Sequence, residues 1–214
     1  MPRKEERLIY KFEELSAEAK ERAIEQYKNR GWDWDEHDTK MLEEYFQEEL
    51  ETLGLPGGDI RWRLNYSQGD GMAFYGKVDI TDYVTRNNLA TPSEYLPLID
   101  ALANDEAEIV IEIEKRQAFH MYDHWNTMVV SSYVNTYDDP GVGGRKRWPQ
   151  RIGRPKLERL THQLTEHIRG HVKDVSHKLE KAGYEEIEYK SSDEVIADNI
   201  TANDYEFDED GSFV

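Results

Sequence analysis

The sequence predicts an α+β fold in which helices cover one face of an antiparallel sheet built from two long hairpins. Two stretches of alternating apolar and polar residues, 60–80 and 107–136, each turn back on themselves through a polar connection. Apolar residues at helical spacing mark other segments, of which 155–182 in the C-terminal half is the longest. Because 214 residues suit one core and no repeat is visible, we expect a single α+β domain over 1–214.

The hairpin at 60–80 is the element around which the rest is organised. One face of its first strand carries apolar side chains, namely Ile60, Trp62, Leu64 and Tyr66. The other face carries Arg61, Arg63 and Asn65, and the period of two resumes after the turn at Met72. Gly69 and Gly71 flank Asp70 and allow the positive φ angles that a tight or bulged turn requires.

The second hairpin contains the strongest strand signal in the chain, Ala107–Lys115, with Ile109, Ile111 and Ile113 on one face. We expect it to pair with Thr127–Thr136. The connection at 119–126 carries several histidine, tyrosine and aspartate side chains.

Helices are predicted in the N-terminal half by their caps and spacing. After a short strand at Leu8–Phe12, Ser16 caps a first helix, and a second helix over about 36–53 stops at Gly54. A capping box at Thr91–Glu94 begins a short helix that runs through Leu102.

The C-terminal half begins with the long helix at 155–182, which we expect Gly183 to terminate. Its apolar stripe either covers the sheet or forms a seam in a homo-oligomer, and covering the sheet is favoured because a sheet needs one covered face. A strand at Ile187–Tyr189 and a helix capped by Ser191–Glu194 are predicted to follow.

Composition restricts the class of protein. With no cysteine, the chain has no disulfides and no thiolate chemistry, and its formal charge of −18 disfavours direct contact with nucleic acid or an anionic membrane. The sequence contains no apolar run long enough to span a membrane and no signal peptide, so we expect a cytoplasmic protein.

The charge is unevenly distributed along the chain. The Gly- and Pro-rich loop predicted at 137–156 holds six basic and two acidic residues, whereas the segment 185–214 holds eleven acidic residues and one lysine. The basic loop could hold an anionic ligand or pair with the acidic C-terminal segment, and the sequence leaves both open.

A candidate ligand site combines the first hairpin, the 119–126 connection and the basic loop. Its residues would stack on a ligand or bind its polar and anionic groups: Arg61, Arg63, Tyr66, Ser67, Gln68, Asp70, Phe74, Tyr75, His120, Tyr122, His124, Arg145 and Arg147. The alternative is that Ser67, Gln68 and Asp70 are turn residues and nothing more.

Catalytic and cofactor motifs are weak. The glycines form no dinucleotide or Walker fingerprint, and no nucleophile elbow is present, so we expect no cofactor and favour a binding protein over an enzyme. His120 with His124, or His167 with His171 and Asp174, have spacings that metal sites use, but ordinary polar positions are favoured for both sets.

Three motifs carry a resemblance to a known family. They are Tyr10–Ser16 with Ala19, Lys20 and Ala23; Tyr66–Gly71 with Phe74 and Gly76; and Ala202–Asn203 with Tyr205–Phe207 and Asp210–Gly211. The chain resembles a group of uncharacterised phage and prophage proteins, some of which carry a label linking their N-terminal part to antitoxins. The resemblance implies a phage accessory protein that acts inside a bacterium.

Two functions follow as hypotheses. The first is an anti-defence binding protein that sequesters a small anionic or nucleotide-like ligand without turnover. The second is an acidic inhibitor that mimics nucleic acid and presents carboxylates from Glu185 to Asp210 to a basic host protein. A metal-assisted hydrolase is a distant third.

Overall fold

The structure is a computed structural model that describes residues 7–30, 36–89, 94–116, 122–136 and 153–214. It confirms the α+β class, with a four-stranded antiparallel sheet, a two-stranded sheet and a long helix in the C-terminal half. The described chain divides into two compact units, residues 40–182 (unit 2) and residues 1–39 with 183–214 (unit 1). The single domain expected from the sequence over 1–214 stays a prediction.

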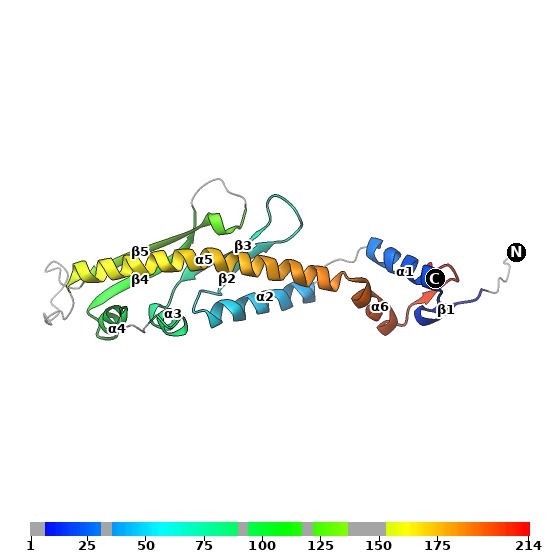
Figure 1. Ribbon diagram of the computed structural model, residues 1–214, viewed down its shortest axis with the longest axis horizontal. Coiled ribbons are helices and arrows are strands. Elements are labelled where there is room, and N and C mark those ends of the chain that lie inside the picture. The colour runs from blue at the N-terminus through cyan, green and yellow to red at the C-terminus, as the bar shows by residue number, and fades with distance from the viewer. Residues whose placement is uncertain (1–6, 31–35, 90–93, 117–121, 137–152) are drawn as a thin grey trace. The chain divides into compact units, whose positions relative to one another are not determined.

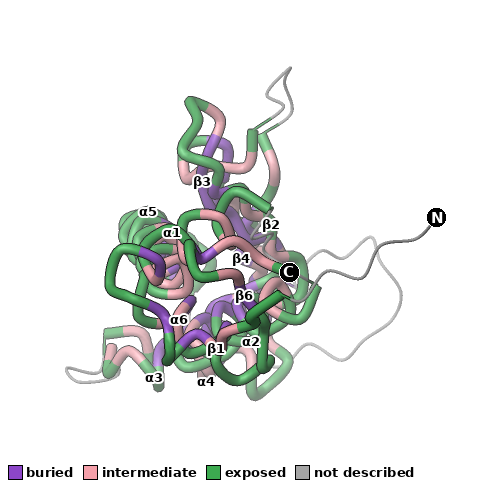
Figure 2. Tube along the Cα trace, turned by 90° about the vertical axis from the view of Figure 1, so that its right-hand side faces the viewer, coloured by how far each residue is buried: buried purple, intermediate pink, exposed green. Residues whose placement is uncertain are grey.

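The sheet of unit 2 contains both predicted hairpins in the order β2-β3-β4-β5. The first pairs β2 (Asp59–Arg63) with β3 (Gly71–Lys77), and the second pairs β4 (Ala107–Lys115) with β5 (Met128–Thr136). β2 alternates between half-buried and exposed residues as predicted, whereas β3 is buried from Gly71 to Tyr75, as Figure 2 shows by colour. β3 therefore lies at the centre of the unit and is covered on both faces.

Helix α5 (Arg154–Lys190) belongs to unit 2 up to residue 182, and this part of it lies along the sheet (Figure 1). The predicted stripe is buried: Leu157, Leu160, Leu164, Ile168, Val172, Val175 and Leu179. The buried Ser176 hydroxyl donates a hydrogen bond to the Met72 carbonyl of β3, which ties the middle of the helix to the central strand. The apolar stripe of α5 therefore covers the sheet, which is the use that the sequence favoured.

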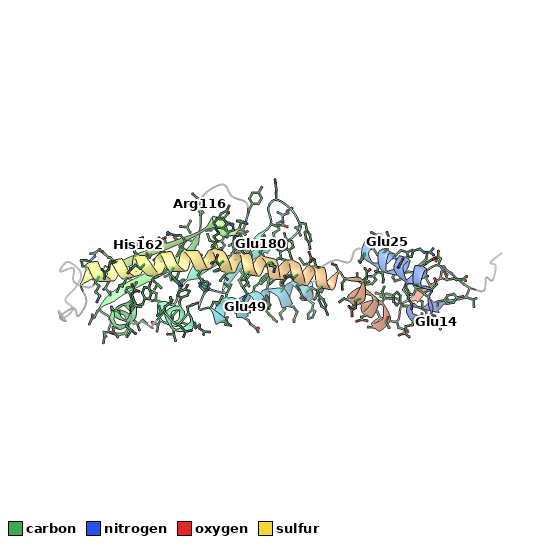
Figure 3. All side chains as sticks on the ribbon, in the orientation of Figure 1. Glu14, Glu25, Glu49, Arg116, His162 and Glu180 are labelled. Atoms are coloured by element: carbon green, nitrogen blue, oxygen red, sulfur yellow. The ribbon has the colours of Figure 1, made fainter. Side chains whose placement is uncertain are left out.

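Three shorter helices complete unit 2: α2 (Glu36–Thr52), α3 (Ile80–Arg86) and α4 (Leu96–Ala103). α2 ends at Thr52, shortly before the predicted stop at Gly54, whose φ of 68° suits glycine. Glu49 of α2, labelled in Figure 3, forms an ion pair with Lys178 of α5. The sequence analysis missed α3, which starts where the Asp79 carboxylate accepts a hydrogen bond from the Asp82 amide.

Unit 1 is formed by the two ends of the chain. Strand β1 (Tyr10–Lys11) pairs antiparallel with β6 (Glu206–Phe207), and the 3-10 helix η1 (Phe12–Glu14) follows β1. Helices α1 (Ala17–Asn29) and α6 (Asp193–Ala202) begin at the predicted caps, Ser16 and Ser192. Their shared core is Phe12, Leu15, Ala19, Ala23, Ile196, Ile200 and Phe207. The first and third sequence motifs therefore build one core.

Four local predictions were wrong. The helix expected to begin at Thr91–Glu94 starts only at Leu96, after the N-cap residue Tyr95. Gly183 does not end α5, which continues to Lys190, so the strand expected at Ile187–Tyr189 is helical. The last residues of the predicted basic loop, from Arg154 on, form the first turn of α5. The first strand is only two residues long, because Phe12 already belongs to η1.

No helix in the described ranges combines the length and the hydrophobicity that crossing a membrane requires.

Candidate functional site

The turn of the first hairpin packs against the connection of the second. A Cβ atom added to Gly71 would lie 2.7 Å from the Asp123 carbonyl oxygen and 2.8 Å from His124 Cδ2. One added to Gly69 would lie 2.7 Å from two ring carbons of Tyr122. The two glycines thus permit the approach that brings the predicted halves of the ligand site together.

Asp70 holds the turn itself. Its buried carboxylate accepts hydrogen bonds from the Asn65 amide at 2.7 Å, the Ser67 amide at 2.9 Å and the Ser67 hydroxyl at 2.7 Å. Both side chains therefore have the structural role that the sequence left open as an alternative to ligand binding. Gln68 is exposed, and Tyr66 lies outside β2 with a φ of 54° and 65% of its surface exposed.

Asp123, in the connection of the second hairpin, is at the centre of a cluster of polar side chains. Its carboxylate accepts a hydrogen bond from Tyr75 at 3.2 Å and forms an ion pair with Lys115 at 2.8 Å. The Arg61 guanidinium lies 5.6 Å from the centre of the Tyr75 ring and is paired with Asp59 at 3.0 Å. Burial raises the pKa of Tyr75, and the hydrogen bond that Arg61 donates to the Asp59 carboxylate is the main cause of a raised pKa for Arg61. The phenol is therefore neutral and the guanidinium charged at neutral pH.

An aromatic group with a cation lies next to this polar group. The centre of the Trp125 ring lies 5.6 Å from that of His124 and 5.7 Å from that of His177 on α5. The Lys173 ammonium lies 4.6 Å from the centre of the same indole. We call the following residues the turn cluster: Arg61, Tyr75, Lys115, Asp123, His124, Trp125, Lys173 and His177.

The turn cluster contains some of the predicted site residues and not others. Arg61, Tyr75 and His124 belong to it. Tyr122 lies outside it, with its ring against Gly69 of the turn, and Arg63 is exposed opposite Gly71. Phe74 is fully buried, so it belongs to the core. The predicted residues that lie outside the described ranges are His120, Arg145 and Arg147.

Five members of the turn cluster were not predicted as site residues: Lys115, Asp123, Trp125, Lys173 and His177. Lys173 and His177 lie four residues apart on α5, which places them on one helix face. That spacing identifies a face of the helix but not what the face meets. The signal available in the sequence was therefore incomplete.

The histidines proposed as metal ligands on α5 meet a tyrosine instead. The Tyr83 hydroxyl lies 3.1 Å from His167 Nδ1 and 2.8 Å from His171 Nδ1. Burial is the main cause of a lowered pKa for His171, and nearby His167 lowers it further. Within the described ranges no three His, Asp or Glu side chains gather in a way that could hold a metal ion.

The acidic C-terminal segment is partly paired inside unit 1. Lys28 pairs with Asp193 at 2.6 Å, and Lys11 pairs with Asp204 at 3.0 Å and with Glu206 at 3.3 Å. Arg7 and Asp208 form another pair. These carboxylates thus join the two ends of the chain.

Comparison with known proteins found no match: no family model, no curated protein and no solved structure is similar to this chain.

Proposed function

We propose that this protein binds a small anionic, nucleotide-like ligand at the turn cluster and holds it without turnover. The observation that carries the proposal is the half-buried indole of Trp125, with the rings of His124 and His177 and the Lys173 ammonium around it. Aromatic rings offer stacking area to a flat ligand ring, and an ammonium beside them attracts its anionic group.

Local charge supports an anionic ligand. Arg61, Lys115 and Lys173 belong to the turn cluster, and Arg63 lies opposite Gly71 at the same end of the sheet. Arg116, labelled in Figure 3, is exposed directly after β4, where its amide bonds to the Thr127 carbonyl. Arg61 and Lys115 are already paired with Asp59 and Asp123, so Arg63, Arg116 and Lys173 are the cations that support a phosphate or carboxylate at this end of the sheet.

Binding without turnover is supported by how the reactive side chains are used. His124 Nδ1 accepts a hydrogen bond from the Asn126 amide at 3.3 Å, which caps the 3-10 helix η2 (Trp125–Thr127). Asp123 and Asp70 accept hydrogen bonds from their own neighbours. The setting that we propose, a phage accessory protein in the bacterial cytoplasm, rests on the resemblance of the three motifs.

The test is a thermal shift titration with adenine nucleotides and cyclic nucleotides at low salt. A ligand at about 100 times its Kd adds about 2.7 kcal/mol to the unfolding free energy and raises Tm. Lys173→Ala and Trp125→Ala are each expected to reduce this rise by weakening binding at least about tenfold, equivalent to about 1.4 kcal/mol.

Lys178→Ala is the matched control, because it removes one cation from the same helix at a residue that pairs with Glu49. It should leave the ligand-induced rise unchanged. The proposal is overturned if no nucleotide shifts the wild-type Tm, or if both cluster variants respond like wild type.

The alternative of an acidic inhibitor has weaker support. This alternative requires the acidic C-terminal segment to bind a host protein. Four of its carboxylates already form ion pairs: Asp193, Asp204, Glu206 and Asp208. Those pairs would have to break before the same oxygens could bind a basic partner.

A further inference from the structure

The outer edge of β5 lacks the protection that the other edge of the sheet has. β2 and β5 are the two edge strands, and β2 is short, with alternate charges at Asp59, Arg61 and Arg63. β5 spans nine residues, MVVSSYVNT, without a charge or a proline. Exposed edges normally carry charges, prolines or bulges because they template the pairing of another strand.

The register shows which backbone groups of β5 point outward. The Arg116 amide bonds to the Thr127 carbonyl at 2.7 Å, so this opposed pair is a hydrogen-bonded pair. In antiparallel strands such pairs alternate with non-bonded ones. Along the ladder, the residues of β5 whose backbone amide and carbonyl groups point away from β4 are therefore Met128, Val130, Ser132, Val134 and Thr136.

Two further hydrogen bonds agree with this assignment of inward and outward backbone groups. Ile111, opposite Ser132, accepts a bond from the Val78 amide at 2.9 Å and so uses its carbonyl on the β3 side. The outward carbonyl of Val130 accepts a bond from the Arg169 side chain of α5 at 3.0 Å. Arg169 thus occupies one edge group, and no described residue bonds the outward amides and carbonyls of Ser132 and Val134.

Beside this edge, the face of the sheet that carries Val129 and Tyr133 is both acidic and apolar. Tyr133 is 50% exposed and donates a hydrogen bond to Glu108 at 3.1 Å, and Ser131 donates one to Glu114 at 2.8 Å. Glu112 lies between these two glutamates on β4. A strand added to β5 would lie about 10 Å from β4, within reach of a lysine or arginine side chain.

We propose that the edge of β5 from Ser132 to Thr136 binds an extended segment of a partner protein whose alternate residues are lysine or arginine. The main chain of that segment pairs with Ser132 and Val134, and its basic side chains approach Glu108, Glu112 and Glu114. A second copy of this chain fits less well, because β5 itself has no basic residue to place beside those glutamates.

The probe is a labelled nine-residue peptide in which lysine alternates with valine and threonine, titrated by fluorescence anisotropy at low salt. We expect saturable binding to the full chain. The same peptide with glutamate in place of lysine should bind at least about tenfold more weakly, since like charges then face each other.

Ser132→Pro tests the edge. The lost amide points away from β4, and residue 132 is exposed, so the β4–β5 ladder keeps its bonds while the docked strand loses one. Peptide affinity should fall at least about tenfold, or about 1.4 kcal/mol, with the thermal transition retained.

Glu108→Gln/Glu112→Gln tests whether the β4 carboxylates attract the basic peptide. It leaves the backbone unchanged, so it tests the proposal even if Ser132→Pro does not fold. Its control, Glu25→Gln/Glu48→Gln, removes the same net charge from exposed positions on α1 and α2. Only the first double variant should weaken binding. The proposal fails if the peptide does not bind, if the glutamate peptide binds equally, or if both double variants lose the same affinity.

Discussion

Tyr83 is a fully buried residue whose hydroxyl contacts two histidine nitrogens, His167 Nδ1 and His171 Nδ1. A phenol has one hydrogen, so it can donate to only one of them, and the other histidine must carry its own hydrogen on Nδ1 to donate back. Burial raises the pKa of Tyr83, which keeps the phenol protonated. This three-residue group fixes α3 on α5.

Replacing Tyr83 by phenylalanine leaves both Nδ1 atoms without this partner. Because His171 is half-buried, we expect Tyr83→Phe to lower the unfolding free energy by about 1–3 kcal/mol, measured by urea denaturation. Tyr133→Phe is the control, since it removes an exposed hydroxyl that donates to Glu108, and it should cost less than about 0.5 kcal/mol. Equal losses would contradict this account.

The lowered pKa of His171 predicts a pH dependence. Its causes are burial and then His167, while Asp174 acts in the opposite direction. The unfolded chain, with a pKa near 6.5, binds this proton more readily than the folded one, so this contribution to stability is complete above pH 6.5 and is lost as pH falls through the folded pKa. Between about pH 7.5 and about pH 5.5, Tm should fall more in wild type than in His171→Gln. Parallel profiles for the two proteins would refute it.

At the scale of elements, a methyl group added to a glycine has a different effect in the first hairpin turn than in α5. A methyl group at Gly71 meets backbone atoms of Asp123 and His124 at 2.7–3.1 Å, whereas one at Gly170 meets nothing within 4 Å. The first position is a contact between two hairpins, and the second is an exposed helix interior.

Gly71→Ala is therefore expected to destabilise the protein by about 1–3 kcal/mol, because the packed backbone of the 122–124 segment must move. Gly170→Ala should instead stabilise it by up to about 1 kcal/mol through helix propensity. Chemical denaturation of both variants measures the difference. If Gly71→Ala is neutral, the close packing of the two turns is wrong.

At the scale of the molecule, net charge outweighs individual ion pairs. Most of the ion pairs in the described ranges are solvent-exposed, such as Lys11 with Asp204, and pairs of this kind contribute about 0–1 kcal/mol each. The formal charge of −18 opposes folding by repulsion throughout the compact state.

We therefore expect Tm to rise as sodium chloride increases from about 20 mM to about 500 mM, since the Debye length falls and repulsion is screened. A differential scanning measurement at constant pH records the change. Lys28→Ala, which removes an exposed pair with Asp193, should keep the same upward salt dependence. A Tm that falls with salt would show that specific pairs dominate.

The sequence by itself predicted the hairpins, most helix starts and the buried stripe of α5. These features depend on local chemistry: side-chain alternation, caps such as Ser16 and Ser192, and apolar spacing. The prediction that Gly183 ends α5 was wrong. One glycine inside a helix destabilises it by only about 1 kcal/mol, and the helical turns on either side offset that loss.

Only the tertiary structure decided which predicted site residues lie together. Asp70 was a candidate ligand contact with a turn role as the alternative, and it accepts hydrogen bonds from its own turn. Phe74 was also a candidate ligand contact, but it lies fully buried in a strand covered on both faces. Lys173 and Trp125 are 48 positions apart (173 − 125), so no local pattern links them. Their contact exists because α5 lies along the sheet and passes beside η2, and such a long-range arrangement follows from packing of the whole unit.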